Sequence, residues 1–124
     1  MNHGIVFSNL SQKEIYQKVY HEAHQNSYTT YLRGSRCTDE VAFFHEISAS
    51  FQFPWYFGEN WAAFDECICD LEWLHFSRIF IAVDDFSIMF GGNKDLQNCL
   101  IKYFTIMIEY WKSESILVEI WLNN

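Results

Sequence analysis

Apolar residues recur at helical spacing directly after a polar start of the chain. Ile15 and Val19 lie four residues apart, with mostly polar residues between them. Ser11 and Glu14 match the S-x-x-E capping box, in which each side chain bonds the backbone N–H of the other residue. The pattern predicts a short amphipathic helix over residues 12–25.

Two more helices are expected on either side of the single proline of the chain. Thr38 is a favourable N-cap for the first of them, which should end before Pro54, because a residue that precedes proline avoids the α conformation. Gly58 then permits a tight turn, and Asn60 can cap a helix over residues 61–74. These capping and turn-forming residues divide the region into a helix, a loop and a second helix.

Three segments are rich in β-branched and aromatic residues and have the length of strands: Tyr28–Arg33, residues 79–83 and residues 116–122. The second, IFIAV, is apolar throughout, which is typical of a strand buried on both faces of a parallel sheet. A last helix over residues 94–111 separates it from the third. The order of elements predicts an α/β fold with a small three-stranded parallel sheet packed with helices.

The composition fits one globular domain. Half of the 124 residues are apolar, and no apolar run approaches the roughly 18 residues of a membrane span. The start, MNHGIVFSNLS, lacks the basic region and the long apolar run of a signal peptide, so we expect a cytoplasmic chain. We interpret residues 1–27 as an N-terminal extension with the short helix, and residues 28–124 as the main domain.

The cysteines and histidines show no metal-binding spacing. Cys67 and Cys69 are two residues apart and point in different directions on a helix, so reduced thiols are expected. His21 and His24 lie three apart on a predicted helix, where two surface histidines are commoner than a metal pair. The sequence therefore predicts neither a metal nor a cofactor.

The net charge of −8 argues against nucleic acid as a direct partner, because phosphate binding requires a basic surface. Residues 37–77 contain no Lys or Arg and eight of the 16 acids. The eight acids are Asp39, Glu40, Glu46, Glu59, Asp65, Glu66, Asp70 and Glu72. One interpretation is a solvated surface that aids solubility, and the other is a field that attracts a basic partner.

The predicted helix after Gly58 has an unusual outer face. Trp61, Phe64 and Ile68 share the arc expected to pack on the core. The opposite arc and its edge mix carboxylates, small residues and one large aromatic, without a cation: Ala62, Asp65, Glu66, Cys69, Asp70 and Trp73. Aromatic residues beside acids are typical of a recognition patch.

The run PWYFGENWAAFDEC, residues 54–67, closely resembles the hallmark segment of barstar-like proteins, in which a proline, two aromatics and Gly-Glu-Asn precede an acidic helix. The similarity extends over about residues 28–122 and leaves residues 1–27 outside. It implies a barstar-like fold and a bacterial, cytoplasmic immunity protein or antitoxin that inhibits a ribonuclease toxin.

In that family the loop and the helix cover the nuclease active site, and an acid of the helix enters its phosphate-binding pocket. Together with the outer face described above, the positions carried over give ten candidate toxin-binding residues: Tyr56, Phe57, Gly58, Asn60, Ala62, Asp65, Glu66, Cys69, Asp70 and Trp73. Glu66 stands where the family has its central Asp, whereas Ala62 replaces a usual acid and Asp65 replaces an aromatic. Lys102 and Glu109 on the last helix are alternative candidates for a further contact.

The resemblance implies a monomer in a 1:1 complex with a basic nuclease toxin, without direct contact to nucleic acid or a membrane.

Two other functions stay open on the sequence. A small hydrolase would use His45 or His75 with nearby acids, but the chain has no nucleophile elbow, phosphate loop or zinc spacing. A regulatory module whose acidic face binds a basic protein other than a nuclease would show the same charge pattern. An enzyme would turn over a substrate alone, whereas an inhibitor would be silent until its nuclease is added.

Overall fold

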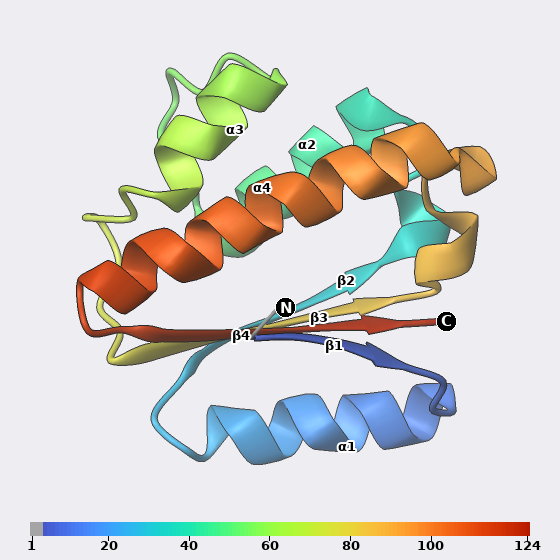
Figure 1. Ribbon diagram of the computed structural model, residues 1–124, viewed down its shortest axis with the longest axis horizontal. Coiled ribbons are helices and arrows are strands. Elements are labelled where there is room, and N and C mark those ends of the chain that lie inside the picture. Colours follow the sequence, from blue (N-terminus) through green and yellow to red (C-terminus); the bar gives the residue numbers. More distant parts are fainter. Residues whose placement is uncertain (1–3) are drawn as a thin grey trace.

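The computed structural model describes residues 4–124 as three layers, with helices on both faces of a parallel sheet (Figure 1). The sheet has the strand order β1-β4-β3-β2, and its strands are β1 (Ile5–Ser8), β2 (Tyr28–Arg33), β3 (Arg78–Asp84) and β4 (Leu117–Asn123). The helices are α1 (Gln12–Ala23), α2 (Glu40–Phe51), α3 (Trp61–Ile68) and α4 (Lys94–Ser113), with the short 3-10 helices η1 (Gly34–Arg36) and η2 (Phe86–Gly92). Helix α1 covers one face alone, and α2, α3 and α4 lie on the other side.

Each α-helix begins at a side chain that accepts a hydrogen bond from the first turn. Ser11 makes the predicted capping box with Glu14, and Asn60 and Asn93 cap α3 and α4. The prediction of Thr38 as a cap is wrong, because the neighbouring Asp39 accepts from the Ala42 N–H at 2.8 Å. A carboxylate at this position also interacts favourably with the helix dipole.

The fold contains a fourth strand, which corrects the prediction of a three-stranded sheet. β1 runs parallel to β4, with Ile5 opposite Ile120. Of the predicted N-terminal extension, residues 1–27, the first three lie outside the described residues, and Ile5–Ser8 form this strand. Four residues show too little alternation to identify a strand, and the pairing partner lies far away in the sequence.

Helix α1 covers the sheet face that the other helices leave free. Ile15 is fully buried against Phe80 and Ala82 of β3, and Val19 and Trp121 pack beside them. Central strand β3 is therefore buried on both faces, as its apolar sequence predicts. The short helix of the predicted N-terminal extension is thus one of the three layers.

Asn123 ties the carboxyl ends of three strands together. Its side chain accepts from Ser8 Oγ at 2.8 Å and from the Leu10 N–H at 2.7 Å, and its amide donates to Asp84 Oδ1 at 2.9 Å. The Tyr31 hydroxyl donates to the other Asp84 oxygen at 2.7 Å. Open α/β sheets commonly bind ligands at this edge, but here side chains of the chain itself fill it.

Helix α3 is shorter than the predicted helix over residues 61–74. It ends at Ile68, and Leu71 then adopts a left-handed φ of 50° that carries its side chain into the core. Burial of Leu71 therefore ends the helix early. No helix in residues 4–124 is long and apolar enough to cross a membrane.

Candidate functional site

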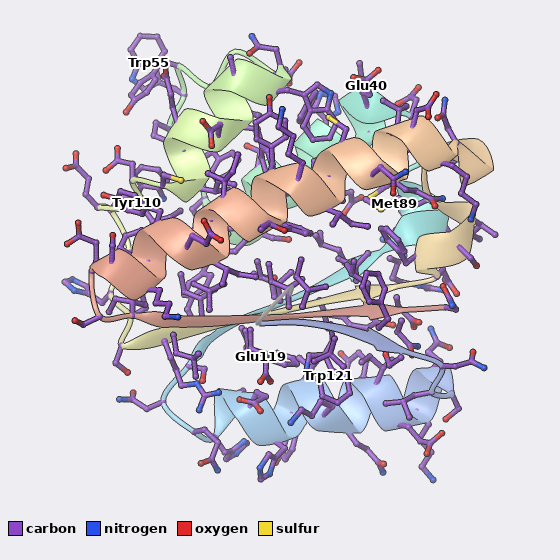
Figure 2. All side chains as sticks on the ribbon, viewed as in Figure 1. Glu40, Trp55, Met89, Tyr110, Glu119 and Trp121 are labelled. Carbon is purple, nitrogen blue, oxygen red and sulfur yellow. The ribbon has the colours of Figure 1, made fainter. Side chains whose placement is uncertain are left out.

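A tight turn holds two aromatic side chains in front of α3. The Phe57 N–H donates to the Pro54 carbonyl at 3.0 Å, which closes a turn with Trp55 and Tyr56 at its tip. Phe57 points inward, with its ring 4.9 Å from that of Phe53. Trp55 and Tyr56 point outward and are 96% and 61% exposed, and Figure 2 shows Trp55 projecting away from the body of the molecule.

The second half of the loop is fixed by Asn60. Its Oδ1 accepts from the Ala63 N–H at 2.8 Å, and its Nδ2 donates to the Gly58 carbonyl at 3.1 Å. Glu59 has a left-handed φ of 51°, and its carboxylate lies 2.9 Å from Nε2 of His45 on α2. The loop is thus held from α3 and from α2 at once, and it presents a defined surface.

A small acidic pocket lies between the loop and α3. Its volume is about 130 Å³, and it is lined by Tyr56, Phe57, Ala63, Glu66, Cys67 and Asp70. Glu66 and Asp70 are both exposed and four residues apart. The ion pairs within residues 4–124 involve Glu22 and Glu59, and none involves Glu66 or Asp70. The two carboxylates therefore face solvent without a cation of their own chain.

A second strip, formed by α3 and the residue directly after it, carries Ala62, Asp65 and Cys69. The Cys69 thiol donates to Asp65 Oδ1 at 3.9 Å. Burial, and then the charge of Asp65, raise the pKa of the Cys69 thiol to about 11. Cys69 is therefore a neutral thiol at physiological pH, and its hydrogen bond orients Asp65.

The tryptophans of this region differ in their surroundings. Trp61 donates its indole N–H to Glu40 at 2.7 Å and stacks on Tyr103 of α4, with ring centroids 5.5 Å apart. Its role is therefore structural, as its position on the predicted core-facing arc of the helix indicates. Trp73 is half-buried and donates to the Phe51 carbonyl at 2.8 Å. Because α3 ends at Ile68, Trp73 does not lie on the predicted outer face of the helix, and its part in binding stays a prediction.

The ten predicted residues therefore fall into four groups. Tyr56, Glu66 and Asp70 are exposed around the acidic pocket, while Gly58 and Asn60 shape the loop. The second strip lies beside them. Phe57 and Trp73 pack partly on the core. Both Lys102 and Glu109 are exposed on α4 and lie seven residues apart, hence on one face.

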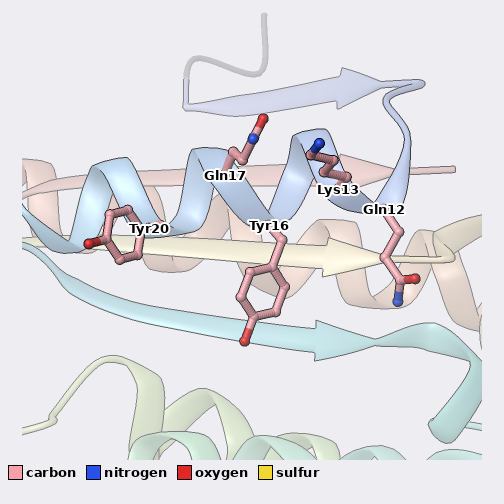
Figure 3. Close-up of a pocket in the computed structure, with 5 residues that line it drawn as sticks. All are labelled: Gln12, Lys13, Tyr16, Gln17 and Tyr20. Carbon is pink, nitrogen blue, oxygen red and sulfur yellow. The ribbon is translucent and has the colours of Figure 1, made fainter.

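A larger surface hollow lies elsewhere and is the outer surface of a single helix. It measures about 690 Å³ and is lined by Gln12, Lys13, Tyr16, Gln17 and Tyr20, all on α1 (Figure 3). All five are exposed, and no second element encloses them. Small-molecule sites are concave and enclose their ligands, so the hollow does not have the geometry of one.

Within residues 4–124, no group of three or more His, Cys, Asp or Glu side chains is arranged to hold a metal ion. His24 Nδ1 lies 2.9 Å from the Tyr20 carbonyl, which engages that nitrogen locally. The four cysteines are free thiols.

Sequence reasoning missed Trp55. A large apolar residue one position after proline, in a predicted turn, has no periodic partner and cannot be assigned to a core face. That isolation was a usable signal, because a tryptophan without a place in the core must lie on the surface. The structure places it beside Tyr56, with ring centroids 5.8 Å apart.

A family model described as Barstar (barnase inhibitor) matches residues 28–123 of the chain. The match runs from β2 to the end of β4 and excludes β1 and α1. A search of curated proteins for similar sequences gives no match. The resemblance seen in the sequence is thus confirmed at the level of the family, and the whole candidate site lies within the matched segment.

Proposed function

The chain belongs to the barstar (barnase inhibitor) family, and on this premise we propose that it is an immunity protein or antitoxin that inhibits a ribonuclease toxin. The inhibiting surface is the loop of residues 54–60 together with α3. The partner is a basic protein, and the complex contains one copy of each chain. The proposed site inhibits the ribonuclease by occupying its active site, and it carries no catalytic residue of its own.

The observation that carries this proposal is the acidic pocket beside the exposed Tyr56. Glu66 and Asp70 lack any cation from their own chain. A ribonuclease active site binds phosphates and is therefore cationic, so carboxylates held at fixed positions can replace the phosphates there. The opposite charges also accelerate association, which protects a cell before much RNA is cut.

Glu66 is proposed as the central carboxylate. It extends from the middle of α3, whose first turn is fixed by Asn60 and whose inner face is fixed by Phe64 in the core. One methylene longer than Asp, it reaches further from the helix. Ala62 lacks the acid common at its position, so the carboxylate of Asp70 is expected to supply part of the missing charge.

The test compares Glu66→Lys with Glu114→Lys, which makes the same charge change at an exposed residue after α4. Two purified ribonuclease candidates serve as partners: barnase, and the product of the gene directly upstream. We expect Glu66→Lys to weaken inhibition at least about thirtyfold, since removal of one member of a buried charge pair costs about 2–5 kcal/mol and each 1.4 kcal/mol is about tenfold. Glu114→Lys should change the association rate alone.

Added salt should slow association of the wild-type chain, because surface charges are screened beyond a Debye length of about 8 Å at physiological ionic strength. Tight binding of a basic protein without ribonuclease activity would favour a non-inhibitory regulatory module instead. If a ribonuclease is inhibited equally by wild type and Glu66→Lys, the assignment of the central carboxylate is wrong.

A further inference from the structure

Trp55 differs from every other tryptophan of the chain. The other four donate their indole N–H groups: Trp61 to Glu40, Trp73 to Phe51, Trp111 to Ile68 and Trp121 to Glu119. Trp55 makes no hydrogen bond within residues 4–124 and is 96% exposed. A tryptophan normally buries its rings and satisfies its N–H within the fold, so nothing in this fold requires Trp55.

The turn that carries Trp55 is nevertheless well fixed. Its two ends are joined by the Phe57-to-Pro54 hydrogen bond, and the rings of Phe53 and Phe57 anchor it to the core. The Trp55 and Tyr56 rings meet edge to face at 84°. An exposed aromatic side chain on a fixed turn loses little conformational entropy when it binds, which is the main cost of ordering a contact.

The position of the turn indicates what would cover Trp55. Tyr56 lines the acidic pocket with Glu66 and Asp70, so the indole continues the surface proposed to bind the ribonuclease. A partner with a cationic active site carries Arg and Lys around it. A guanidinium or ammonium group binds favourably over an indole face, since Trp gives the strongest interaction of this kind and Arg is the more frequent cation.

We propose that Trp55 is an additional anchor of the interface, which stacks on an Arg or Lys side chain at the rim of the ribonuclease active site. The inference rests on the proposed function and adds a contact outside the ten predicted residues. It places an aromatic contact at the loop tip, beside the carboxylates of α3. Residues at the centre of an interface that are Trp, Tyr or Arg commonly dominate its binding energy.

The experiment uses the full chain with barnase and with the product of the gene directly upstream. Trp55→Ala should raise the dissociation rate constant about tenfold or more, while the association rate constant changes less than about twofold because no charge is altered. Trp55→Phe keeps a ring and should recover part of the loss. Ile88→Ala removes another exposed apolar side chain, on η2, and should bind as wild type does.

The outcomes separate the two proposals. If the wild type inhibits neither ribonuclease, the proposed function and the proposal that Trp55 is an anchor are both wrong. If the wild type inhibits one of them and Trp55→Ala dissociates at the wild-type rate, the anchor alone is overturned. An equal loss in Ile88→Ala also overturns it. The urea midpoint of Trp55→Ala should equal that of the wild type, since the side chain has no role in folding.

Discussion

Asn60 links the shape of the loop to the start of α3 through a single side chain. Its oxygen caps the helix at the Ala63 N–H, and its amide group holds the Gly58 carbonyl. We expect Asn60→Ala to lower the free energy of unfolding by about 1 kcal/mol, the usual cost of losing an N-cap. It should also weaken ribonuclease binding, because the loop loses its fixed position relative to Glu66.

Asn93 offers a matched control for this prediction. It caps α4 by accepting from the Leu96 N–H at 3.1 Å, and it lies outside the candidate site. Asn93→Ala should cost a similar stability, measured by urea unfolding, and leave the dissociation constant unchanged. If both variants weaken binding equally, the effect of Asn60 is one of general stability and the loop plays no separate part.

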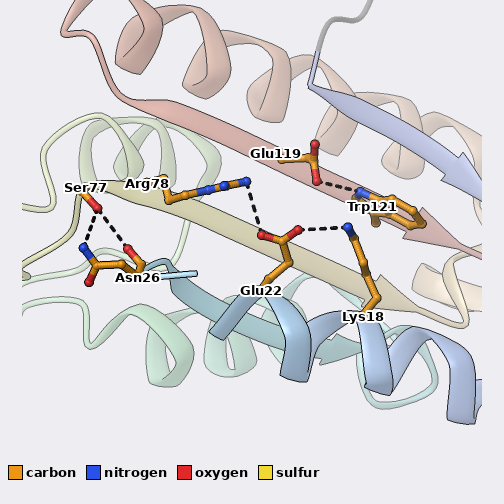
Figure 4. Close-up of polar contacts among 7 residues, drawn as sticks. All are labelled: Lys18, Glu22, Asn26, Ser77, Arg78, Glu119 and Trp121. Carbon is orange, nitrogen blue, oxygen red and sulfur yellow. Dashed lines mark hydrogen bonds and ion pairs between the residues drawn. The ribbon is translucent and has the colours of Figure 1, made fainter. Parts of the chain in front are cut away.

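At the scale of elements, α1 is attached to the sheet by a partly buried charge cluster (Figure 4). Glu22 is buried and lies 2.9 Å from Lys18 Nζ and 3.3 Å from Arg78 Nη2. The contact with Arg78 is an ion pair without hydrogen-bond geometry. Lys18 also lies over the Trp121 ring at 5.0 Å. One carboxylate therefore neutralises two cations beneath the sheet.

Glu22→Ala should destabilise the fold more than an ordinary surface substitution. It leaves Arg78, and Lys18 over the Phe80 and Trp121 rings, without their counter-charge, and we expect a loss of about 1–3 kcal/mol in the free energy of unfolding. Glu114→Ala, at an exposed position, is the control and should stay within about 0.5 kcal/mol. Equal urea midpoints for the two variants would contradict a stabilising role of the cluster.

The elements that the sequence predicts well have their own local signals. Strand β2 has the predicted bounds, and α1 and α4 begin at the predicted residues, because capping side chains and apolar periodicity mark those places. The end of α3 depends instead on Leu71 reaching the core, and β1 depends on pairing with β4. Both are tertiary effects, which no pattern of neighbouring residues reveals.

The same division applies to the candidate site. The loop and acidic helix are visible in the sequence because proline, glycine, asparagine and the acids lie within one short run. Which of these side chains are exposed is not visible there. Phe57 and Trp73 turn partly inward and Trp55 fully outward, because the core has room for some rings of the cluster and not for others.

At the scale of the whole molecule, the proposed binding surface lies on one side of the sheet, and α1 with its small core cluster lies on the other. The loop and α3 lie on the side of α2 and α4, while α1 lies alone on the other (Figure 1). The matched family segment contains the first side and excludes β1 and α1. A change under α1 should therefore alter stability without altering the affinity for a ribonuclease.

A chain that begins at residue 28 tests this division. It loses the strand that pairs with β4 and the burial of two large apolar side chains, because Ile15 is removed and Phe80 is uncovered, and both are fully buried in the full chain. We expect the free energy of unfolding to fall by roughly 3–6 kcal/mol, since each large apolar side chain returned to water costs about 1.5–3 kcal/mol. That is a large part of the roughly 5–15 kcal/mol of an ordinary domain, so the urea midpoint should fall well below that of the full chain.

Ile15→Ala in the full chain separates loss of stability from loss of binding. The side chain is fully buried, and its truncation should cost about 2–5 kcal/mol in urea unfolding. Below the unfolding transition, the dissociation constant with a ribonuclease should match the wild type, because Ile15 contacts the sheet face that points away from Glu66.

Each of the two experiments has an outcome that would contradict this division. A chain starting at residue 28 that unfolds at the wild-type urea concentration would show that β1 and α1 are an appendage. A binding defect in folded Ile15→Ala would show that the two sides of the sheet are coupled.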